Sequence, residues 1–118
     1  MTNYKNNLDL SISIFKALSD SNRLRLYLAL EENEICVCHL TEMLGLAPST
    51  VSKHLSVLKQ ASLIESIKKG KWIYYFRSKR SEIDELNILA RSIVNILKNE
   101  PKIKKDIQTL KKIGEATK

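Results

Sequence analysis

Residues 44–55, which read LGLAPSTVSKHL, contain the signals that decide the fold. Gly45 is a typical residue just beyond the last turn of a helix, and Pro48 suits the first position of the next helix. The segment therefore predicts two helices joined by a turn at residues 46–48, which is the arrangement of a helix-turn-helix.

The two helices that flank this turn have an amphipathic pattern. A short helix is expected over Val37–Leu44 and a longer one over about Pro48–Ala61. In the longer helix, Val51, Leu55 and Leu58 share one stripe, and polar side chains gather on the opposite side. The polar side includes Ser49, Ser52, Lys53, Ser56, Lys59 and Gln60. This helix should bury one face and present a basic, hydrogen-bonding face outwards.

Two further helices are expected before this unit. The first covers residues 8–18, where the apolar residues at helical spacing are Leu8, Ile12, Phe15 and Leu18. The second should begin after Asp20, a residue type that caps helix N-termini, and run to about Glu32. Its leucines alternate as in a strand, but the cap and the intervening residues favour a helix that is buried on much of its surface.

After residue 61 the apolar period changes from that of a helix to that of a strand. Leu63–Ile67 and Trp72–Phe76 are rich in β-branched and aromatic residues, and they flank a basic segment that contains Gly70. This pattern predicts a β-hairpin with a positively charged tip.

Two more helices should follow the hairpin, one from about Glu82 to Leu97 and one, after Pro101, over about residues 103–113. The order helix, short helix, helix, hairpin is that of a winged helix-turn-helix, so the expected fold class is mainly α with a small β-hairpin. No linker divides the chain, and we expect a single domain over residues 1–118.

The positive charge is concentrated in the middle of the chain. The net charge is +7, and residues 46–80 carry eight Lys or Arg against one Asp or Glu, a surplus as large as that of the whole chain. A basic face confined to one supersecondary unit is the electrostatic footprint of phosphate binding. It favours a nucleic acid as partner over a generally basic, solvated surface.

The N-terminus and the cysteines favour a cytoplasmic location. The polar residues 1–7 are not a signal peptide, and no stretch approaches the ~18 apolar residues of a membrane span. We therefore expect no membrane partner. Cys36 and Cys38 are separated by one residue, so a disulfide between them would close a small, strained ring. A reducing compartment fits this pair better.

From about Ala17 to Ser78 the sequence resembles the ArsR/SmtB family of winged-helix repressors that sense metals and metalloids. The matching pieces, in the family's order and spacing, are LSDSNRLRL at 18–26, ICVCHL at 35–40, VSKHL at 51–55 and GKWIYY at 70–75. The resemblance implies a homodimer paired through its N-terminal and C-terminal helices, here about 8–18 and 82–113. It also implies double-stranded operator DNA as partner, with one recognition helix in each of two successive major grooves. The apolar stripes of the helices expected at 8–18 and 82–97 agree with a homodimer. A core of this size does not need to cover both helices, so pairing with a second copy would bury the surplus.

A recognition helix projects small polar side chains at base edges and cations at phosphates. The residues predicted to contact DNA are Ser49, Thr50, Ser52, Lys53, His54, Ser56, Lys59 and Gln60 on this helix and Lys68, Lys69 and Lys71 at the wing tip. Among them Lys53 is the strongest candidate for a direct contact, and the first-turn amides could hold a phosphate. For His54, a packed histidine bonded to backbone and a phosphate ligand both remain open. In two departures from the family, Ala47 replaces a capping residue and Ser62 stands where glycine is common.

Cys36 and Cys38 resemble the Cys-Val-Cys motif with which family sensors bind arsenic, antimony or soft divalent metals. The resemblance implies trivalent arsenic or antimony as inducer and no obligatory cofactor. Thiolate sulfur prefers such ions, and trivalent arsenic takes a pyramid of three sulfurs. Side chains two residues apart on a helix point ~200° apart. We therefore expect the helix start to unwind when both sulfurs bind one ion, which would disturb the recognition helix.

The donor set departs from the full arsenic pattern. Thr41 occupies the position, three residues after Cys38, where a third thiol often lies. Water, a small-molecule thiol or His39 could complete the site, although His39 is expected to be simply exposed. With only two cysteines, one chain cannot complete a four-thiolate site for cadmium or lead. Residues 82–97 contain no histidine, which excludes the zinc site that other relatives build on their last helix.

Three hypotheses remain open. The favoured one is a repressor that releases its operator when trivalent arsenic binds Cys36 and Cys38. The second is a repressor of the same fold that senses oxidation or another thiophilic species through this pair. The third is a DNA-binding regulator without thiol sensing, in which the cysteines are small apolar residues. We do not expect an enzyme, because a dithiol oxidoreductase usually has two residues between its thiols and the sequence shows no acid–base pair or phosphate loop.

Overall fold

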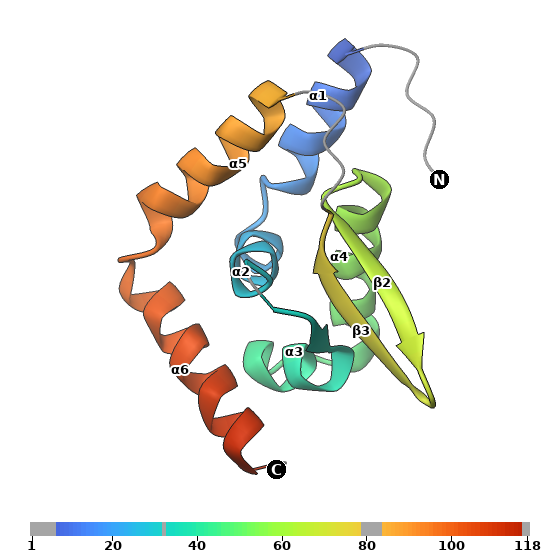
Figure 1. Ribbon diagram of the computed structural model, residues 1–118, viewed down its shortest axis with the longest axis vertical. Helices are drawn as coiled ribbons and strands as arrows, with labels where there is room; N and C mark the ends of the chain where they lie inside the picture. The colour runs from blue at the N-terminus through green and yellow to red at the C-terminus, as the bar shows by residue number, and fades with distance from the viewer. Residues whose placement is uncertain (1–6, 32, 79–83, 117–118) are drawn as a thin grey trace.

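The computed structural model describes residues 7–31, 33–78 and 84–116, which form six helices and a three-stranded antiparallel sheet (Figure 1). In chain order the elements are α1 (Asn7–Ala17), α2 (Ser21–Ala29), β1 (Ile35–Cys36), α3 (Val37–Leu44), α4 (Pro48–Gln60), β2 (Ile64–Lys69), β3 (Trp72–Arg77), α5 (Asp84–Leu97) and α6 (Pro101–Ala116). The predicted fold class, a mainly α winged helix-turn-helix with a small hairpin, is confirmed.

The helix-turn-helix predicted from residues 44–55 is formed by α3 and α4. Gly45 follows α3 with a left-handed φ of 67°, and its N–H donates to the carbonyl of Thr41 at 3.0 Å. Pro48 opens α4, and Ala47 before it makes no side-chain capping bond, as expected for a poor cap. The stripe of Val51, Leu55 and Leu58 is fully buried. This burial fixes α4 with its polar side outwards.

Asp20 caps α2, as predicted, because its Oδ1 accepts from the backbone N–H groups of Asn22 and Arg23 at 2.8 and 3.1 Å. The predicted end near Glu32 is wrong. The helix stops at Ala29, and the N–H of Leu30 turns back to the carbonyls of two preceding residues. Glu32 itself lies outside the described residues. Five consecutive residues of this region, 26–30, are buried, which agrees with a helix covered on much of its surface.

The wing is an antiparallel hairpin of β2 and β3 in which Lys69 faces Trp72 across the turn. Gly70 supplies the turn's left-handed backbone, with φ of 62°. Ser62, between α4 and β2, also has a positive φ of 63°. That backbone conformation explains why glycine is common in the family at this position, since a side chain is strained there.

The sheet contains a strand that the sequence analysis does not predict. Its order is β1-β3-β2, and the two-residue strand β1 pairs with β3, with Ile35 opposite Tyr75 and Cys36 opposite Tyr74. The segment that leads into α3 is thereby joined to the wing by backbone pairing.

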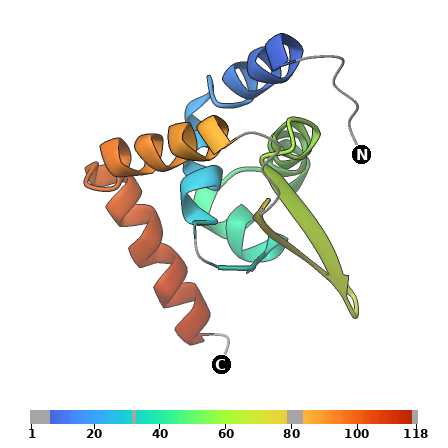
Figure 2. The ribbon, with the colours of Figure 1, turned by 45° about the horizontal axis from the view of Figure 1, so that its top comes forward.

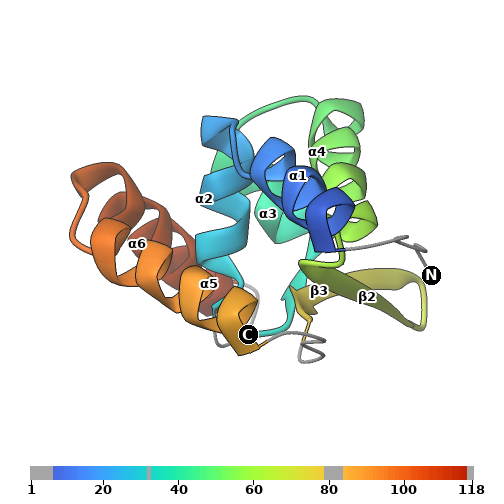
Figure 3. The same cartoon turned by 90° about the horizontal axis from the view of Figure 1, so that it is seen from above.

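The core lies among α2, α3 and α4, and the wing and α6 lie on opposite sides of it (Figure 2). Seen from above, α5 and α6 lie on the side of α2 that faces away from α4 (Figure 3). Arg25 of α2 holds α6 by a two-point ion pair with Asp106, with Nε–Oδ2 at 2.8 Å and Nη2–Oδ1 at 2.9 Å. Asp106 is buried, so this pair is a fixed anchor for α6.

The terminal helices differ in part from their predicted bounds. The predicted start near Glu82 lies outside the described residues, and α5 is described from Asp84. The last helix is longer than predicted, because it begins at Pro101 itself and reaches Ala116. Among the described residues, no helix combines the length and the apolar character needed to cross a membrane.

The helices α1 and α5 lie towards the same end of the molecule (Figure 1). Both helices expose large apolar side chains. The core-facing residues of α1 are Leu10, Ile14 and Ala17. Three residues of its predicted stripe face solvent, with Leu8 at 68% and Phe15 at 61% exposure and Ile12 at 42%, whereas Leu18 packs partly against the core. In α5, Ile88 and Ile96 are 55% and 73% exposed. Apolar surface of this kind marks an interface more often than bare solvent contact.

Candidate nucleic-acid interface and thiol site

The outward face of α4 carries most of the side chains predicted to contact DNA. Seven of the eight helix residues in that set are exposed: Ser49, Thr50, Ser52, Lys53, Ser56, Lys59 and Gln60. The helix contains two lysines and no acidic residue. In its first turn, the N–H groups of Thr50 and Val51 both donate to the carbonyl of Ala47. Because Pro48 has no N–H, only the amide of Ser49 remains for a phosphate among these first-turn groups.

His54 is the eighth residue of that set, and it occupies a packed position. Its side chain is half-buried, and its Nδ1 lies 3.3 Å from Nη1 of Arg23. Arg23 in turn donates from Nε to the carbonyl of Ala17 at 2.7 Å. His54 therefore connects α4 to the junction of α1 and α2, and its partner is an arginine side chain and not the backbone group that we considered.

The three wing-tip lysines are exposed and differ in their contacts. Lys69 forms an ion pair with Glu34, the residue just before β1, and its Nζ lies 5.4 Å from the ring centre of Tyr74. Lys71 lies over Trp72, with its Nζ 5.3 Å from the ring centre. Lys68 and Lys71 present their charge at the tip, whereas Lys69 ties the tip to the segment that precedes the thiols.

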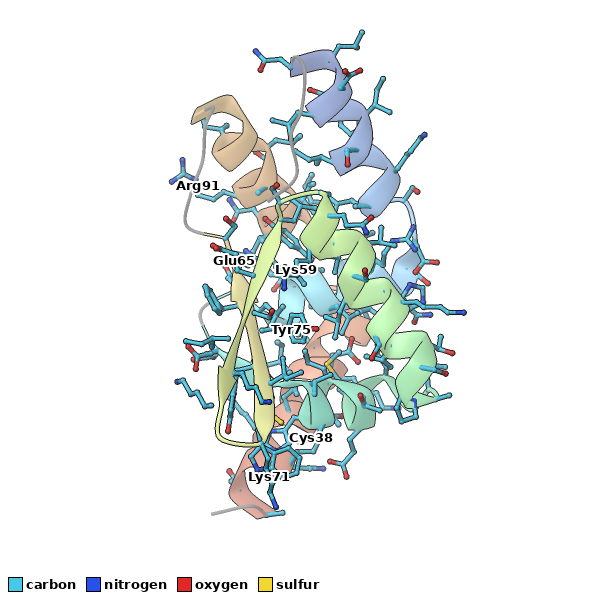
Figure 4. All side chains as sticks on the ribbon, turned by 90° about the vertical axis from the view of Figure 1, so that its right-hand side faces the viewer. Cys38, Lys59, Glu65, Lys71, Tyr75 and Arg91 are labelled. Atoms are coloured by element: carbon cyan, nitrogen blue, oxygen red, sulfur yellow. The ribbon has the colours of Figure 1, made fainter. Side chains whose placement is uncertain are left out.

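Lys59 contacts the wing as well. Its Nζ donates to Oγ of Ser66 at 2.8 Å, and Figure 4 shows it reaching from α4 towards β2. The positions of α4 and the wing are thus linked by a side-chain contact in addition to their shared core.

Cys36 and Cys38 lie close together without any unwinding of α3. Cys36 ends β1 and caps α3 with extended backbone, φ of −60° and ψ of 138°, and its Sγ accepts from the N–H of Cys38 at 3.4 Å. The ~200° argument does not apply to this pair, because Cys36 stands outside the helix. That the start of α3 unwinds when both sulfurs bind one ion stays a prediction. Desolvation and the neighbouring Cys36 thiol raise the pKa of Cys38 to about 11.

The two thiols differ in access. Cys36 is buried and Cys38 is exposed, and both are unbridged. Cys38 lies towards the end of the molecule that carries the wing tip, marked in Figure 4 by Lys71. Thr41 offers little as a third donor, because its Oγ1 already donates to the carbonyl of Val37 at 2.8 Å. Within the described ranges, no group of three or more His, Cys, Asp and Glu side chains is arranged to hold a metal ion.

A cavity of about 330 Å³ adjoins Cys36. It lies between the segment that leads into α3, the strand β3 and the helix α6, and its lining residues are Ala29, Asn33, Glu34, Ile35, Cys36, His39, Tyr74, Ile107, Leu110 and Lys111. His39 is thus half-buried in a cavity wall, and the expectation that it is simply exposed is wrong. The cavity places a space that a small molecule can occupy beside the buried residue Cys36.

Two residues near these sites, Arg23 and Glu34, have roles that the sequence analysis does not assign. The sequence feature that could have indicated the role of Glu34 is its acidic side chain next to the cysteine segment, in a chain whose hairpin tip is strongly basic. The signal for Arg23 was its place three residues after the cap Asp20, within the run that matches the family. Neither signal identifies the partner, which lies 31 or more positions away in both pairs.

Comparison with known proteins agrees with this geometry. Residues 20–66 match the family described as "Bacterial regulatory protein, arsR family". The arsenic resistance transcriptional regulator of Pseudomonas putida is 41% identical over 63 residues, covering 52% of this chain and 49% of that protein. A cadmium resistance transcriptional regulatory protein of Listeria innocua is 44% identical over 63 residues, covering 52% and 53%. The chain spans about half the length of these curated relatives.

The fold has solved counterparts. A homodimeric winged helix-turn-helix DNA-binding domain from Mycobacterium bovis superposes with a TM-score of 0.63 at 26% identity, covering 79% of this chain and 82% of that one. The family consists of regulatory proteins and not of enzymes. An ArsR-like transcriptional regulator from Rhodococcus sp. is 31% identical with a TM-score of 0.57, covering 74% of this chain and 78% of that one. With the matching residues, the fold and this relative in agreement, the chain belongs to the arsR family of bacterial regulatory proteins.

Proposed function

We propose that the protein is a homodimeric transcriptional repressor that binds operator DNA and releases it when trivalent arsenic binds Cys36 and Cys38. The observation that carries this proposal is the position of the thiol pair. Cys36 pairs through β1 with Tyr74 of the wing, and Cys38 lies in the first turn of α3, which packs against α4. Both elements expected to contact DNA are therefore direct neighbours of the two sulfurs.

DNA binding is supported by the charge and exposure of α4 and the wing. The short polar side chains of α4 suit base edges, and Lys53, Lys68 and Lys71 suit phosphates. Because these contacts displace counterions from the duplex, operator affinity should fall steeply with salt.

Dimerisation is supported by the exposed apolar side chains of α1 and α5, which a second copy would cover. The Mycobacterium bovis domain of the same fold is a homodimer. A two-fold pair places two copies of α4 in successive major grooves, so the operator is expected to be pseudo-palindromic.

Trivalent arsenic fits the donor set better than cadmium, although relatives are named for both. The chain has two cysteines, and its described residues hold no three-donor cluster of His, Cys, Asp and Glu. A four-thiolate cadmium site therefore cannot be completed from one chain. Trivalent arsenic needs three sulfurs, so two thiols already supply most of its ligands.

The route from the thiols to the DNA is short. Drawing the sulfur of Cys36 towards a shared ligand displaces β1, which is hydrogen-bonded to β3, and drawing in Cys38 moves the first turn of α3. Either movement changes the position of the wing relative to α4. A coupling of ~1–3 kcal/mol, which is 5–150-fold in operator affinity, is typical of such a link.

The test uses the double variant Cys36→Ser/Cys38→Ser and fluorescence anisotropy with a duplex selected from random DNA by the protein itself. We expect unchanged operator affinity and no release by arsenite. The matched control is Thr41→Val in the same helix, which should keep the arsenite response. Arsenite release from the double variant would overturn the thiol site. Parallel titrations with antimonite, cadmium, zinc and peroxide identify the inducer, and release by peroxide alone would support the oxidation hypothesis instead.

A further inference from the structure

The cavity beside Cys36 has a wall suited to a small amphipathic molecule with an acidic group. We infer that it binds a carboxylate-bearing monothiol of low molecular weight, which supplies the third sulfur to trivalent arsenic held by Cys36 and Cys38. The inference rests on the proposed function and names the ligand that completes its sensing site.

The number of sulfurs requires a donor from outside this chain. Trivalent arsenic takes a pyramid of three sulfurs, and the sequence contains two cysteines. Thr41 cannot replace the third thiol, because its hydroxyl is bonded within α3. Dimerisation does not supply the missing sulfur when each copy binds one arsenic atom. Two arsenic atoms would need six sulfurs, and a homodimer has four cysteines.

The cavity lies where that donor is needed. Cys36 belongs both to the thiol pair and to the cavity wall, whereas Cys38 does not line the cavity. A thiol placed in the cavity would therefore approach the pair from the side of Cys36. The volume of about 330 Å³ is at the lower end of the range for small-molecule sites, roughly 300–1,000 Å³. It suits a metabolite-sized thiol.

The lining residues indicate the chemistry of the rest of that molecule. Ile35, Ile107 and Leu110 give the cavity an apolar side, which suits the carbon chain of a thiol. Lys111 of α6 lines the same cavity and forms no ion pair with any residue that the structure describes, whereas the other charged residue of the lining, Glu34, is paired with Lys69. A carboxylate is the natural partner for this ammonium group. Asn33 can bond an amide or a second polar group.

The assembly reaction balances without any redox step. Arsenous acid, As(OH)₃, exchanges its three As–O bonds for As–S bonds to Cys36, Cys38 and the monothiol. Each thiol proton leaves with one hydroxide as water, so three waters are released and arsenic remains trivalent. No oxidant or reductant is needed.

The experiment is native mass spectrometry of the intact protein with arsenite and either glutathione, which has carboxylates, or 2-mercaptoethanol, which has none. We expect one arsenic and one glutathione per chain. Operator release by arsenite should need roughly tenfold less arsenic with glutathione than with 2-mercaptoethanol at equal thiol concentration, the value of about one charged hydrogen bond. Lys111→Ala should remove this advantage. Lys112→Ala is the matched control, because Lys112 is the exposed next residue of α6 and does not line the cavity, and it should behave as the unaltered protein.

Three results would overturn the inference. They are an arsenic complex without bound thiol, one arsenic per dimer held by cysteines of both copies, and an equal effect of the two monothiols that Lys111→Ala leaves unchanged. These results differ from a failure of the proposed function, which appears as arsenite release from Cys36→Ser/Cys38→Ser whatever thiol is present. Circular dichroism of both lysine variants should match that of the unaltered protein, because Lys111 and Lys112 are both exposed.

Discussion

At the scale of single residues, Asp20 shows how one side chain fixes the start of a helix. Its carboxylate accepts two backbone N–H bonds at the first turn of α2. The bond from Arg23 is the main reason that the pKa of Asp20 lies below its ordinary value, and the bond from Asn22 and the nearby His54 and Arg23 charges act in the same direction. We expect Asp20→Ala to lower the free energy of unfolding by about 1 kcal/mol at pH 7, measured by urea denaturation.

This loss should depend on pH with a defined sign. Because folding lowers the pKa of Asp20 below 3.8, its contribution is complete above that value and disappears as pH falls through the folded-state pKa. The difference between the original protein and Asp20→Ala should therefore shrink on acidification below pH ~4. Asp20→Asn is the control, since asparagine caps helices without a charge, and its contribution should not change with pH. A pH-independent loss in Asp20→Ala would contradict the ionic cap.

Lys53 is the residue on which the DNA-reading proposal depends most directly. It is exposed on α4. We expect Lys53→Ala to weaken operator binding several-fold and, if Lys53 contacts a phosphate, to reduce the slope of log affinity against log salt by about one. Lys104→Ala on α6 is the control, because it removes an equal charge far from α4 in sequence and fold. Equal effects of the two substitutions would show a diffuse charge effect and remove Lys53 from the reading surface.

The sequence predicted residue roles well where they depend on local pattern and poorly where they depend on distant partners. The cap of Asp20, the buried stripe of α4 and its exposed polar side follow from spacing alone. His54 and Lys69 do not, because their partners Arg23 and Glu34 come from other elements. No periodicity contains that information, since the pairings form only when the elements pack.

At the scale of elements, the link between α4 and the wing contains a strained residue. Ser62 has a φ of 63°, a conformation that costs a side-chain-bearing residue about 1–2 kcal/mol. Glycine avoids that strain but has more freedom in the unfolded chain, worth about 0.5–1 kcal/mol. We expect Ser62→Gly to raise the free energy of unfolding by roughly 0.5–1 kcal/mol, measured in urea.

The control for this prediction is Ser56→Gly in the exposed middle of α4, where the backbone is helical. There glycine should destabilise the protein by about 0.5 kcal/mol. Opposite signs at the two positions would confirm that the backbone angle decides the effect. A loss of stability in both variants would show that the serine side chain at residue 62 has a contact more important than its strain.

Element prediction was limited by length and by long-range pairing. The strand β1 has two residues, too few for any alternation to show, and it exists because β3 is beside it. The end of α2 was overestimated because nothing in the sequence after Ala29 breaks a helix strongly. The position of α6 depends on the ion pair between Arg25 and Asp106, 81 residues apart, which a sequence pattern cannot reveal.

At the scale of the whole molecule, the proposed dimer depends on the exposed apolar side chains of α1 and α5. We expect Phe15→Glu to weaken dimerisation by roughly 3–6 kcal/mol, since a symmetric interface loses two buried aromatic side chains of about 1.5–3 kcal/mol each. Sedimentation velocity across a concentration series measures the change. Ile67→Glu on the wing is the control, because it places the same charge at an exposed apolar residue outside both helices. A dimer that survives Phe15→Glu and dissociates with Ile67→Glu would move the interface to the wing.

The pairing of Cys36 with Tyr74 has a consequence for how the proposed sensor performs inside a cell. Thermodynamic linkage is reciprocal. If arsenite lowers the affinity of the repressor for its promoter by a given factor, promoter DNA lowers the affinity of the repressor for arsenite by the same factor. Repressor molecules that occupy the chromosome would then respond at higher inducer levels than those in free solution. The copy number of the regulator would thus set the arsenite concentration at which derepression begins, because repressor molecules that are not bound to DNA would bind arsenite first.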